Sequence, residues 1–282
     1  MVAAPKDEEV EKVCPINTVV CIKPVPDIRY WDRLSLDPAT KTLRREGIPI
    51  VISPMDKNAI EEALRIRQAR GGKVTVVSMG PLNTEDILRS AYALGVDDAV
   101  LLTDRTFAGA DTLATAYVLS EGIRKLGNVD LVLLGNESLD GSTGQVGPQV
   151  AEFLGLPSIT HVSEITFTDE TTVQVKSNIE LGFMRIETHL PAVLAVTGDI
   201  NVVHIPSVWG ALWATEKSIA KWTCAELGAE TGRCGLTGSP TWVPEVAPID
   251  VKRRGEVLKG EPTQIAVQLI EKLRADGVLP EI

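Results

Sequence analysis

Short apolar runs rich in β-branched residues alternate with segments of helical spacing, and this alternation constrains the fold of the chain more than any other feature. The runs lie at residues 18–23, 74–78, 99–103, 130–134 and 192–196. Between them, apolar residues recur three and four positions apart, as at Ala59, Ile60 and Ala63. Buried strands that alternate with helices indicate a parallel sheet covered by helices on both faces. We therefore predict an α/β fold.

Local signals mark where the first of these helices begins and ends. Ser53 offers a capping hydroxyl, Pro54 occupies the first helical position, and Asp56 stands at the third. Gly71 and Gly72 then end the helix. Parallel sheets bind ligands beyond the carboxyl ends of their strands, where the strand order reverses, so we expect a site in the loops that follow the strands.

The pattern changes after about Thr160. Residues 173–176 and 183–186 alternate as half-buried antiparallel strands do, and helical spacing returns at residues 262–277. We predict an N-terminal extension (1–17), a nucleotide-binding α/β domain (18–200) with an antiparallel extension, and a partner-recognition segment with a C-terminal arm (201–282).

Composition narrows the class of protein. The chain has 282 residues, 44% of them hydrophobic and 23% charged, which is enough for a substantial core. Its net charge of −10 comes without a basic run, which argues against nucleic-acid binding. Four cysteines form no CxxC motif and have no histidine at metal-ligand spacing, so no metal site is predicted. No segment has transmembrane length, and the acidic N-terminal residues fit neither a signal nor a transit peptide, so we expect a cytoplasmic protein.

The loop Gly135–Gln149 is the strongest candidate for a binding site. It follows the strand at 130–134 and leads into a helical apolar face. Glycines let backbone amides approach an anion, and a helix N-terminus adds unpaired N–H groups, so phosphate is the expected ligand. The loop matches neither GxGxxG nor GxxxxGK[ST]. A flexible loop with an ordinary Ser or Thr helix cap is the alternative.

Two further interpretations concern Ser138, within this loop, and Asp111, which follows another strand. A hydrolase would need Ser138 as a nucleophile, but this serine lacks the GxSxG elbow and the histidines lie far away in sequence. Asp111 begins a second junction between a strand and a helix. It is predicted either to accept a hydrogen bond from a ribose hydroxyl or adenine amino group or to act as a carboxylate in the first turn of the helix.

Six motifs in order carry a resemblance to a known family. They are CIKPVPD at residues 21–27, SPMDKN at 53–58, VSMGP at 77–81, GADTLAT at 109–115, DGSTGQVGP at 140–148 and LPAV at 190–193. Together they resemble the beta subunit of electron-transfer flavoproteins, over a span from Thr18 almost to the C-terminus. The resemblance implies a Rossmann-like, adenine-nucleotide-binding domain in a heterodimer with an alpha subunit that carries its own FAD.

The resemblance also implies which residues contact the nucleotide. These are Cys21, Lys23, Ser53, Pro54, Met55, Asp56, Met79, Asp104, Gly109, Ala110, Asp111, Thr112, Thr115, Gly135, Asn136, Glu137, Ser138, Leu139, Asp140, Gly141, Ser142, Thr143, Gly144, Gln145 and Val146. Ser53 stands where asparagine is common in the family, and an exposed lysine after a strand is the alternative for Lys23.

The identity of the nucleotide decides the role that the resemblance implies. AMP would be structural and would leave the subunit to dock dehydrogenases. FAD would make it a redox participant, and the run 107–116 resembles members in which NADH reduces a beta-bound flavin whose electrons are bifurcated. We favour FAD, with AMP as the alternative. In either reading the chain is an electron-carrier subunit without catalytic residues of its own, and a stand-alone nucleotide-binding enzyme or sensor is a distant third reading.

In this family the segment after LPAV meets the partner dehydrogenase, which the resemblance suggests is of the acyl-CoA type. Ile200 aligns with the apolar anchor of that segment, although a buried isoleucine at a strand end is the alternative. Trp209 and Trp213 lie one helical turn apart where relatives often have clustered Lys and Arg. We expect either a core pair or two aromatic anchors at a more apolar interface.

Overall fold

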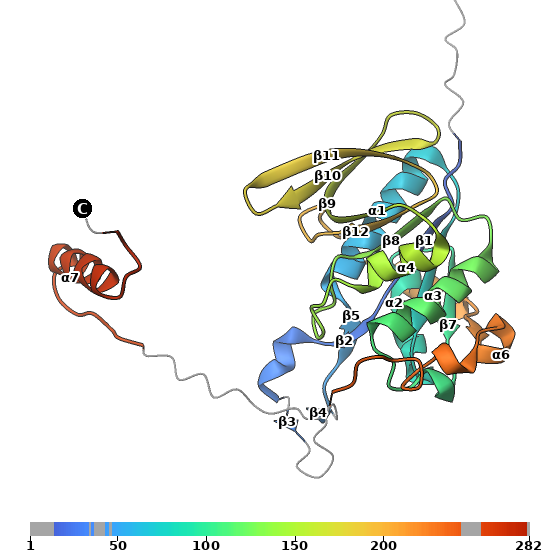
Figure 1. Cartoon of the computed structure of the whole chain (residues 1–282), viewed down its shortest axis with the longest axis horizontal. Helices are drawn as coiled ribbons and strands as arrows, with labels where there is room; N and C mark the ends of the chain where they lie inside the picture. The colour runs from blue at the N-terminus through green and yellow to red at the C-terminus, as the bar shows by residue number, and fades with distance from the viewer. Residues whose placement is uncertain (1–13, 34, 37–42, 45–46, 244–254, 281–282) are drawn as a thin grey trace, which may run out of the picture. The chain divides into compact units, whose positions relative to one another are not determined.

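A computed structural model describes residues 14–33, 35–36, 43–44, 47–243 and 255–280 of the chain, so residues 1–13 of the predicted extension lie outside the described residues. Nine strands form one sheet in the order β11-β10-β9-β12-β8-β1-β6-β7-β13 (Figure 1). Their bounds are β1 (Thr18–Cys21), β6 (Val74–Met79), β7 (Asp98–Leu102), β8 (Leu131–Gly135), β9 (Ser158–Phe167), β10 (Thr172–Ile179), β11 (Gly182–His189), β12 (Ala192–Val196) and β13 (Ala220–Trp222).

The predicted parallel sheet is confirmed. Every pairing from β9 across to β13 is parallel. Helices α1 (Pro54–Arg70), α2 (Glu85–Ala93) and α5 (Val208–Glu216) contribute to the core on one face. Helices α3 (Thr112–Leu126), α4 (Val146–Leu154) and α6 (Cys224–Leu227) contribute to the core on the other. Val20 faces the first core and Val19 the second, because successive strand residues point to opposite faces. Full burial of each such side chain stabilises the fold by about 1.5–3 kcal/mol.

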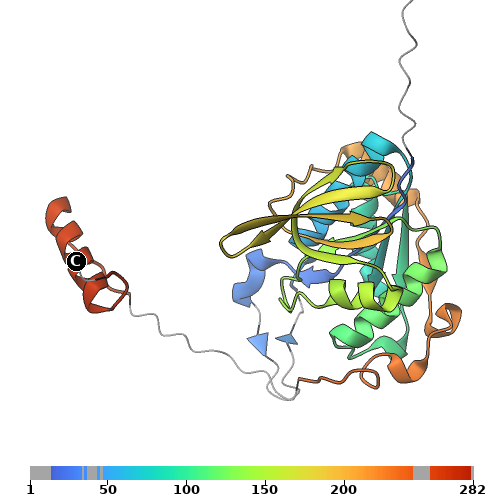
Figure 2. The same cartoon turned by 45° about the horizontal axis from the view of Figure 1, so that its top comes forward.

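The predicted antiparallel extension is also confirmed. Strand β10 pairs antiparallel with both β9 and β11, and the segments that alternate in sequence lie in β10 and β11. Figures 1 and 2 show these yellow strands at one edge of the sheet. The inner strand β10 buries Val173 and Val175, whereas the outer strand β11 leaves Phe183 and Met184 exposed. The edge strand therefore has apolar side chains without a covering layer in the described chain.

The strand order reverses at β1. From β1 the chain moves outward to β6 and β7, and α3 then crosses back to β8 on the other side of β1. The carboxyl ends of these strands open a crevice at the point of reversal, which is where open α/β sheets bind ligands. The loops that follow these strands are therefore the expected place for a binding site in this topology.

The start of α1 differs in one respect from the prediction. Pro54 is the first helical residue and Gly71 the C-cap, as expected. Ser53 occupies the N-cap position, but its hydroxyl makes no capping hydrogen bond and is buried without a partner in the described structure. The polar contacts at this end of α1 come from Asp56 instead, whose carboxylate is turned toward the neighbouring strand ends.

Apart from a helix in the tail, the remaining elements of the described chain are short. Two short antiparallel pairs join β2 (Pro24–Pro26) to β5 (Ile50–Ile52) and β3 (Ser35–Leu36) to β4 (Leu43–Arg44). The 3-10 helices are η1 (Ile28–Arg33), η2 (Leu82–Thr84), η3 (Arg105–Phe107) and η4 (Thr231–Arg233).

The chain divides into two compact units, Met1–Pro244 and Glu245–Ile282. The described part of the second unit contains α7 (Pro262–Ala275), which confirms the helical spacing predicted for the tail. Pro262 begins this helix, where a missing N–H costs nothing. Within the described ranges, none of the helices combines the length and the apolar character that crossing a membrane requires.

Candidate nucleotide-binding site

A cavity of about 610 Å³ lies at the carboxyl ends of β1, β6 and β8, beside the starts of α3 and α4. This volume is within the range of small-molecule and cofactor sites. Most of the residues predicted from the sequence line it: Cys21, Lys23, Asp56, Met79, Ala110, Asp111, Thr112, Thr115, Gly135, Asn136, Glu137, Ser138, Gly141, Thr143, Gly144, Gln145 and Val146. Residues far apart in the chain thus converge at the crevice of strand reversal.

The cavity lining and the predicted set are not identical. Eight predicted residues do not line the cavity: Ser53, Pro54, Met55, Asp104, Gly109, Leu139, Asp140 and Ser142. Five lining residues were not predicted: Ile22, Leu119, Leu134, Gly147 and Val243. Four of these five have a local signal, because each adjoins a predicted residue or, for Leu119, lies one helical turn beyond Thr115. Val243 has none, because it arrives from a distant part of the chain.

Asp56 joins three elements around the cavity. Its Oδ2 accepts a 2.7 Å hydrogen bond from the Lys23 amide after β1, and its Oδ1 accepts a 2.9 Å hydrogen bond from the Gly135 amide at the end of β8. Burial raises the pKa of Asp56 to about 7, against the opposing effect of these two amides. The carboxyl group therefore fixes the strand ends to α1 and is poised to change its charge near neutral pH.

Gly135 must be a glycine for this arrangement to form. A Cβ atom at this position would meet Asp56 Oδ1 at 2.6 Å and Met55 Cβ at 2.7 Å. Contacts this short do not occur in folded proteins without movement of a neighbour. Met55 does not line the cavity, but its Cβ atom lies close to Gly135 where β8 approaches α1.

Lys23 carries the positive charge of the cavity lining. Its Nζ lies 2.6 Å from Asp140 Oδ1 and 3.3 Å from Ser138 Oγ, so both bonds reach into the loop that follows β8. Burial acts to raise the pKa of Asp140, but the hydrogen bond and charge of Lys23 outweigh it and hold that pKa below its usual range. Asp140 thus positions Lys23 rather than forming the cavity wall.

The start of α4 provides donors for an anion. Gln145 is the N-cap residue, and no capping hydrogen bond from its side chain serves the first turn. Its Oε1 instead accepts a 2.9 Å hydrogen bond from Thr112 Oγ1 at the start of α3. Val146 and Gly147 line the cavity, so the N-terminal turn of α4 borders the space where a phosphate would gain from its amides and its dipole.

Two of the predicted acidic residues cap helices. Asp111 Oδ1 accepts hydrogen bonds of 3.0 Å from the amides of Leu113 and Ala114 at the start of α3, which matches the first-turn reading of this residue. Asp104 caps η3 and accepts a further hydrogen bond, of 3.1 Å, from the Cys224 amide. The Thr106 amide, followed by that of Cys224, lowers the pKa of Asp104.

The geometry gives no support to nucleophilic catalysis. In the described chain, the Ser138 hydroxyl contacts Lys23 and not a histidine ring, while His161 lies against Asn136 and Thr160. Burial, followed by the nearby Asp56 charge, raises the pKa of the Cys21 thiol to about 12. A thiol in that state is not a nucleophile at neutral pH.

The predicted docking residues lie in and before α5. Trp209 is 81% exposed and Trp213 is 44% exposed, so the core reading of the tryptophan pair is wrong for Trp209. Lys217 Nζ lies 4.0 Å from the centre of the Trp213 ring. Ile200 is partly buried and packs against the core that contains α1. Its partial burial does not decide between a docking anchor and a buried isoleucine.

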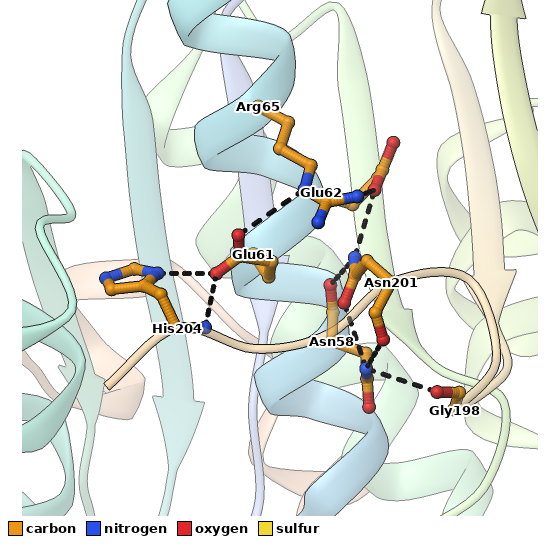
Figure 3. A network of polar contacts seen from close by, with 7 residues as sticks. All are labelled: Asn58, Glu61, Glu62, Arg65, Gly198, Asn201 and His204. Atoms are coloured by element: carbon orange, nitrogen blue, oxygen red, sulfur yellow. Dashed lines mark hydrogen bonds and ion pairs between the residues drawn. The ribbon is translucent and has the colours of Figure 1, made fainter. Parts of the chain in front are cut away.

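A polar network fastens the segment after β12 to α1 (Figure 3). Asn58 Nδ2 donates to the Gly198 carbonyl at 3.3 Å and to the Asn201 carbonyl at 3.0 Å. His204 Nδ1 lies 2.5 Å from Glu61 Oε2. Burial acts to raise the pKa of Glu61, but its hydrogen bonds with His204 outweigh this and lower it. The segment that carries Ile200 is therefore held by the same helix whose first turn borders the cavity.

Comparison with known proteins gives a consistent result. Residues 40–226 match the model of the Electron transfer flavoprotein domain. The chain is 43% identical to the Electron transfer flavoprotein subunit beta of Thermoanaerobacterium thermosaccharolyticum, over 94% of this chain and 100% of that protein. It is 38% identical to the Caffeyl-CoA reductase-Etf complex subunit CarD of Acetobacterium woodii, over 94% of this chain and 100% of that subunit. It is 41% identical to Protein FixA of Azorhizobium caulinodans, over 82% of this chain and 84% of that protein.

Proposed function

The chain belongs to the electron transfer flavoprotein family as a beta subunit, and from this premise we propose that its cavity binds FAD and that the subunit takes part in flavin-based electron bifurcation. A beta subunit of this family implies an alpha-subunit partner. We further propose that the alpha subunit carries a second FAD and that NADH supplies the electrons.

The extent of the cavity is the observation that supports FAD over AMP. The lining begins at the phosphate-binding loop after β8 and continues past Met79 to the start of α3, where Ala110, Thr115 and Leu119 lie. An adenylate held at the loop would leave this second portion vacant. Its apolar members, Met79 and Leu119, offer a surface suited to a flat aromatic ring.

The chain's own contribution is to bind and orient the cofactor. A bound flavin supplies the redox chemistry. The amides at the start of α4 and the Lys23 ammonium would hold the phosphate groups of the cofactor, while the Thr112–Gln145 hydrogen bond links the starts of α3 and α4 on two sides of the cavity. AMP is the second candidate, and with it the subunit would act as a nucleotide-stabilised docking component.

The partner is proposed to be a flavin-dependent dehydrogenase or reductase that acts on CoA esters. The relative from Acetobacterium woodii is named as a subunit of a caffeyl-CoA reductase complex, which motivates this choice. We assign docking to the region that includes Ile200 and α5, and we assign contact with the alpha subunit to the C-terminal arm within 201–282.

Cofactor content tests the proposed function. We expect two FAD molecules per heterodimer when the chain is purified with its alpha subunit and the nucleotides are released by denaturation. Chromatography and absorbance of the released nucleotides provide the measurement. One FAD with one AMP would leave the family assignment intact and overturn the bifurcating role. Reduction of the complex by NADH would support the bifurcating role, and a complex that NADH does not reduce would contradict it.

Replacing both Trp209 and Trp213 with alanine is expected to slow electron transfer to the cognate dehydrogenase by about tenfold or more, because aromatic anchors contribute most of the binding energy at interfaces. Both rings are at least 44% exposed, so bound nucleotide and the unfolding midpoint should stay unchanged. The matched control is Phe183→Ala, which removes a 52% exposed ring on β11. Loss of nucleotide in the double variant would show that the two rings act through the fold.

A further inference from the structure

The segment Gly235–Val243, which we call the strap, brings a late part of the chain to the cavity. Val243 is one of the cavity-lining residues, together with Ala110 and Asp111. One residue of the cavity lining therefore comes from a stretch of chain far beyond the elements that supply the rest.

The strap is packed closely against the residues between η3 and α3. The Leu236 amide donates a 3.0 Å hydrogen bond to the Ala108 carbonyl. Gly235 has a φ of +52°, and a Cβ atom there would meet the Thr106 carbonyl oxygen at 2.1 Å. A glycine is required for this approach, so the path of the strap is determined at its start.

Asp111 fastens the far end of the strap. Its Oδ2 accepts hydrogen bonds from Thr241 Oγ1 at 2.7 Å and from the Thr241 amide at 3.1 Å. Its own amide donates a 2.8 Å hydrogen bond to Ser239 Oγ, which in turn donates a 2.7 Å hydrogen bond to the Gly235 carbonyl. One residue thus holds two points of the strap while its Oδ1 caps α3.

These contacts engage both oxygens of the Asp111 carboxylate. A ribose hydroxyl or an adenine amino group would have to displace Thr241 in order to bond to Oδ2. Burial acts to raise the pKa of Asp111, but the hydrogen bonds from Ala114 and Thr241 outweigh it and lower that pKa. The carboxylate is accordingly charged at neutral pH and engaged with the protein, although it borders the cavity.

We propose that Asp111 is a positioning residue that holds the strap as a wall of the nucleotide cavity, so that the Asp111–Thr241 contact sets how slowly bound nucleotide leaves. This inference rests on the proposed nucleotide-binding function. Val243 lines the cavity but has no hydrogen bond among the described residues that would hold it there. Thr241 has such a bond, to Asp111, and therefore keeps the strap in place.

Two variants test the Asp111–Thr241 contact from opposite sides. Thr241→Val removes the hydroxyl donor and keeps the shape of the side chain. Asp111→Asn keeps a side chain that caps helices well, but its amide group cannot accept two hydrogen bonds at the Oδ2 position. Thr168→Val is the matched control, since its hydroxyl donates a 3.3 Å hydrogen bond to the Thr172 carbonyl outside the cavity.

Each strap variant is expected to release nucleotide roughly tenfold faster than the unmodified protein, because a hydrogen bond to a charged carboxylate is stronger than one between neutral groups. The dissociation rate is measured with FAD and separately with AMP, on the full chain in complex with its alpha subunit. Hydrogen exchange of peptide 236–243 is followed in the same samples, and bound nucleotide should slow it less in the variants than in the control.

The outcomes separate this inference from the proposed function. Release rates within about twofold of the control, with nucleotide still bound, would overturn the role of the strap and leave nucleotide binding intact. An unmodified complex whose beta subunit holds neither FAD nor AMP would overturn both. Faster release together with faster exchange in the strap, but not elsewhere, is the result that we expect.

Discussion

Replacing Gly135 with alanine is expected to remove nucleotide from the purified complex. A Cβ atom at this position would lie 2.6 Å from Asp56 Oδ1 and 2.7 Å from Met55 Cβ. The loop after β8 would then move away from α1 and carry its amides out of line with a phosphate. Because each hydrogen bond to a charged group contributes about 1.5–3 kcal/mol, we expect affinity to fall about a hundredfold.

The same substitution also acts on stability. Overpacking at a buried position typically costs about 1–3 kcal/mol, and the Gly135 amide would lose its 2.9 Å hydrogen bond to Asp56. Calorimetric titration with nucleotide and urea unfolding measure the two effects separately. Gly232→Ala is the matched control, because a Cβ atom there would meet nothing within 4 Å. Normal nucleotide affinity in the Gly135 variant would show that the anion is bound elsewhere.

The elements predicted from the sequence are those with strong local patterns. Residues 18–23 and 130–134 are apolar runs long enough for buried strands, and they form β1 and β8 as expected. The loop after β8 lines the cavity, and it could be selected as a candidate because glycines between a strand and a helix are a local feature. Apolar runs and glycine-rich loops are patterns of residues adjacent in the chain, so they can be identified from one sequence.

The features that were missed depend on contacts between distant residues. Asp111 lies 130 positions from Thr241, and nothing in the local pattern of either residue predicts that they meet. The expected cap of α1 failed for a related reason. Ser53 is 1% exposed and makes no capping bond, whereas Asp56 is drawn to the amides at the ends of β1 and β8. Tertiary contacts determined both outcomes.

Helix α1 links the cavity to the segment that we propose for docking. Its first turn presents Asp56 to the cavity, and farther along the helix Asn58 and Glu61 hold the segment that follows β12. One helix therefore contacts both the cavity and the segment that we propose for docking.

Replacing Asp56 with asparagine is expected to flatten the dependence of stability on pH. Burial raises the pKa of Asp56 from 3.8 to about 7, so between these values the folded protein holds a proton that the unfolded chain releases. The contribution of this group to stability is therefore complete below about pH 4 and is lost as pH rises toward 7, by an amount on the order of 4 kcal/mol.

Urea unfolding from pH 5 to 8 measures this difference between the two proteins. The asparagine side chain of the variant has no proton to release, and its amide group faces one of the two backbone N–H donors, so nucleotide affinity should also fall by roughly tenfold at every pH. Asp130→Asn provides the control, because this carboxylate accepts a 2.8 Å hydrogen bond from the Asn17 amide away from the cavity. Parallel pH profiles for the unmodified chain and the Asp56 variant would show that the Asp56 carboxyl does not titrate in this range. A flatter profile for the variant would instead identify Asp56 as the group whose ionisation lowers the stability of the folded chain as pH rises toward neutrality.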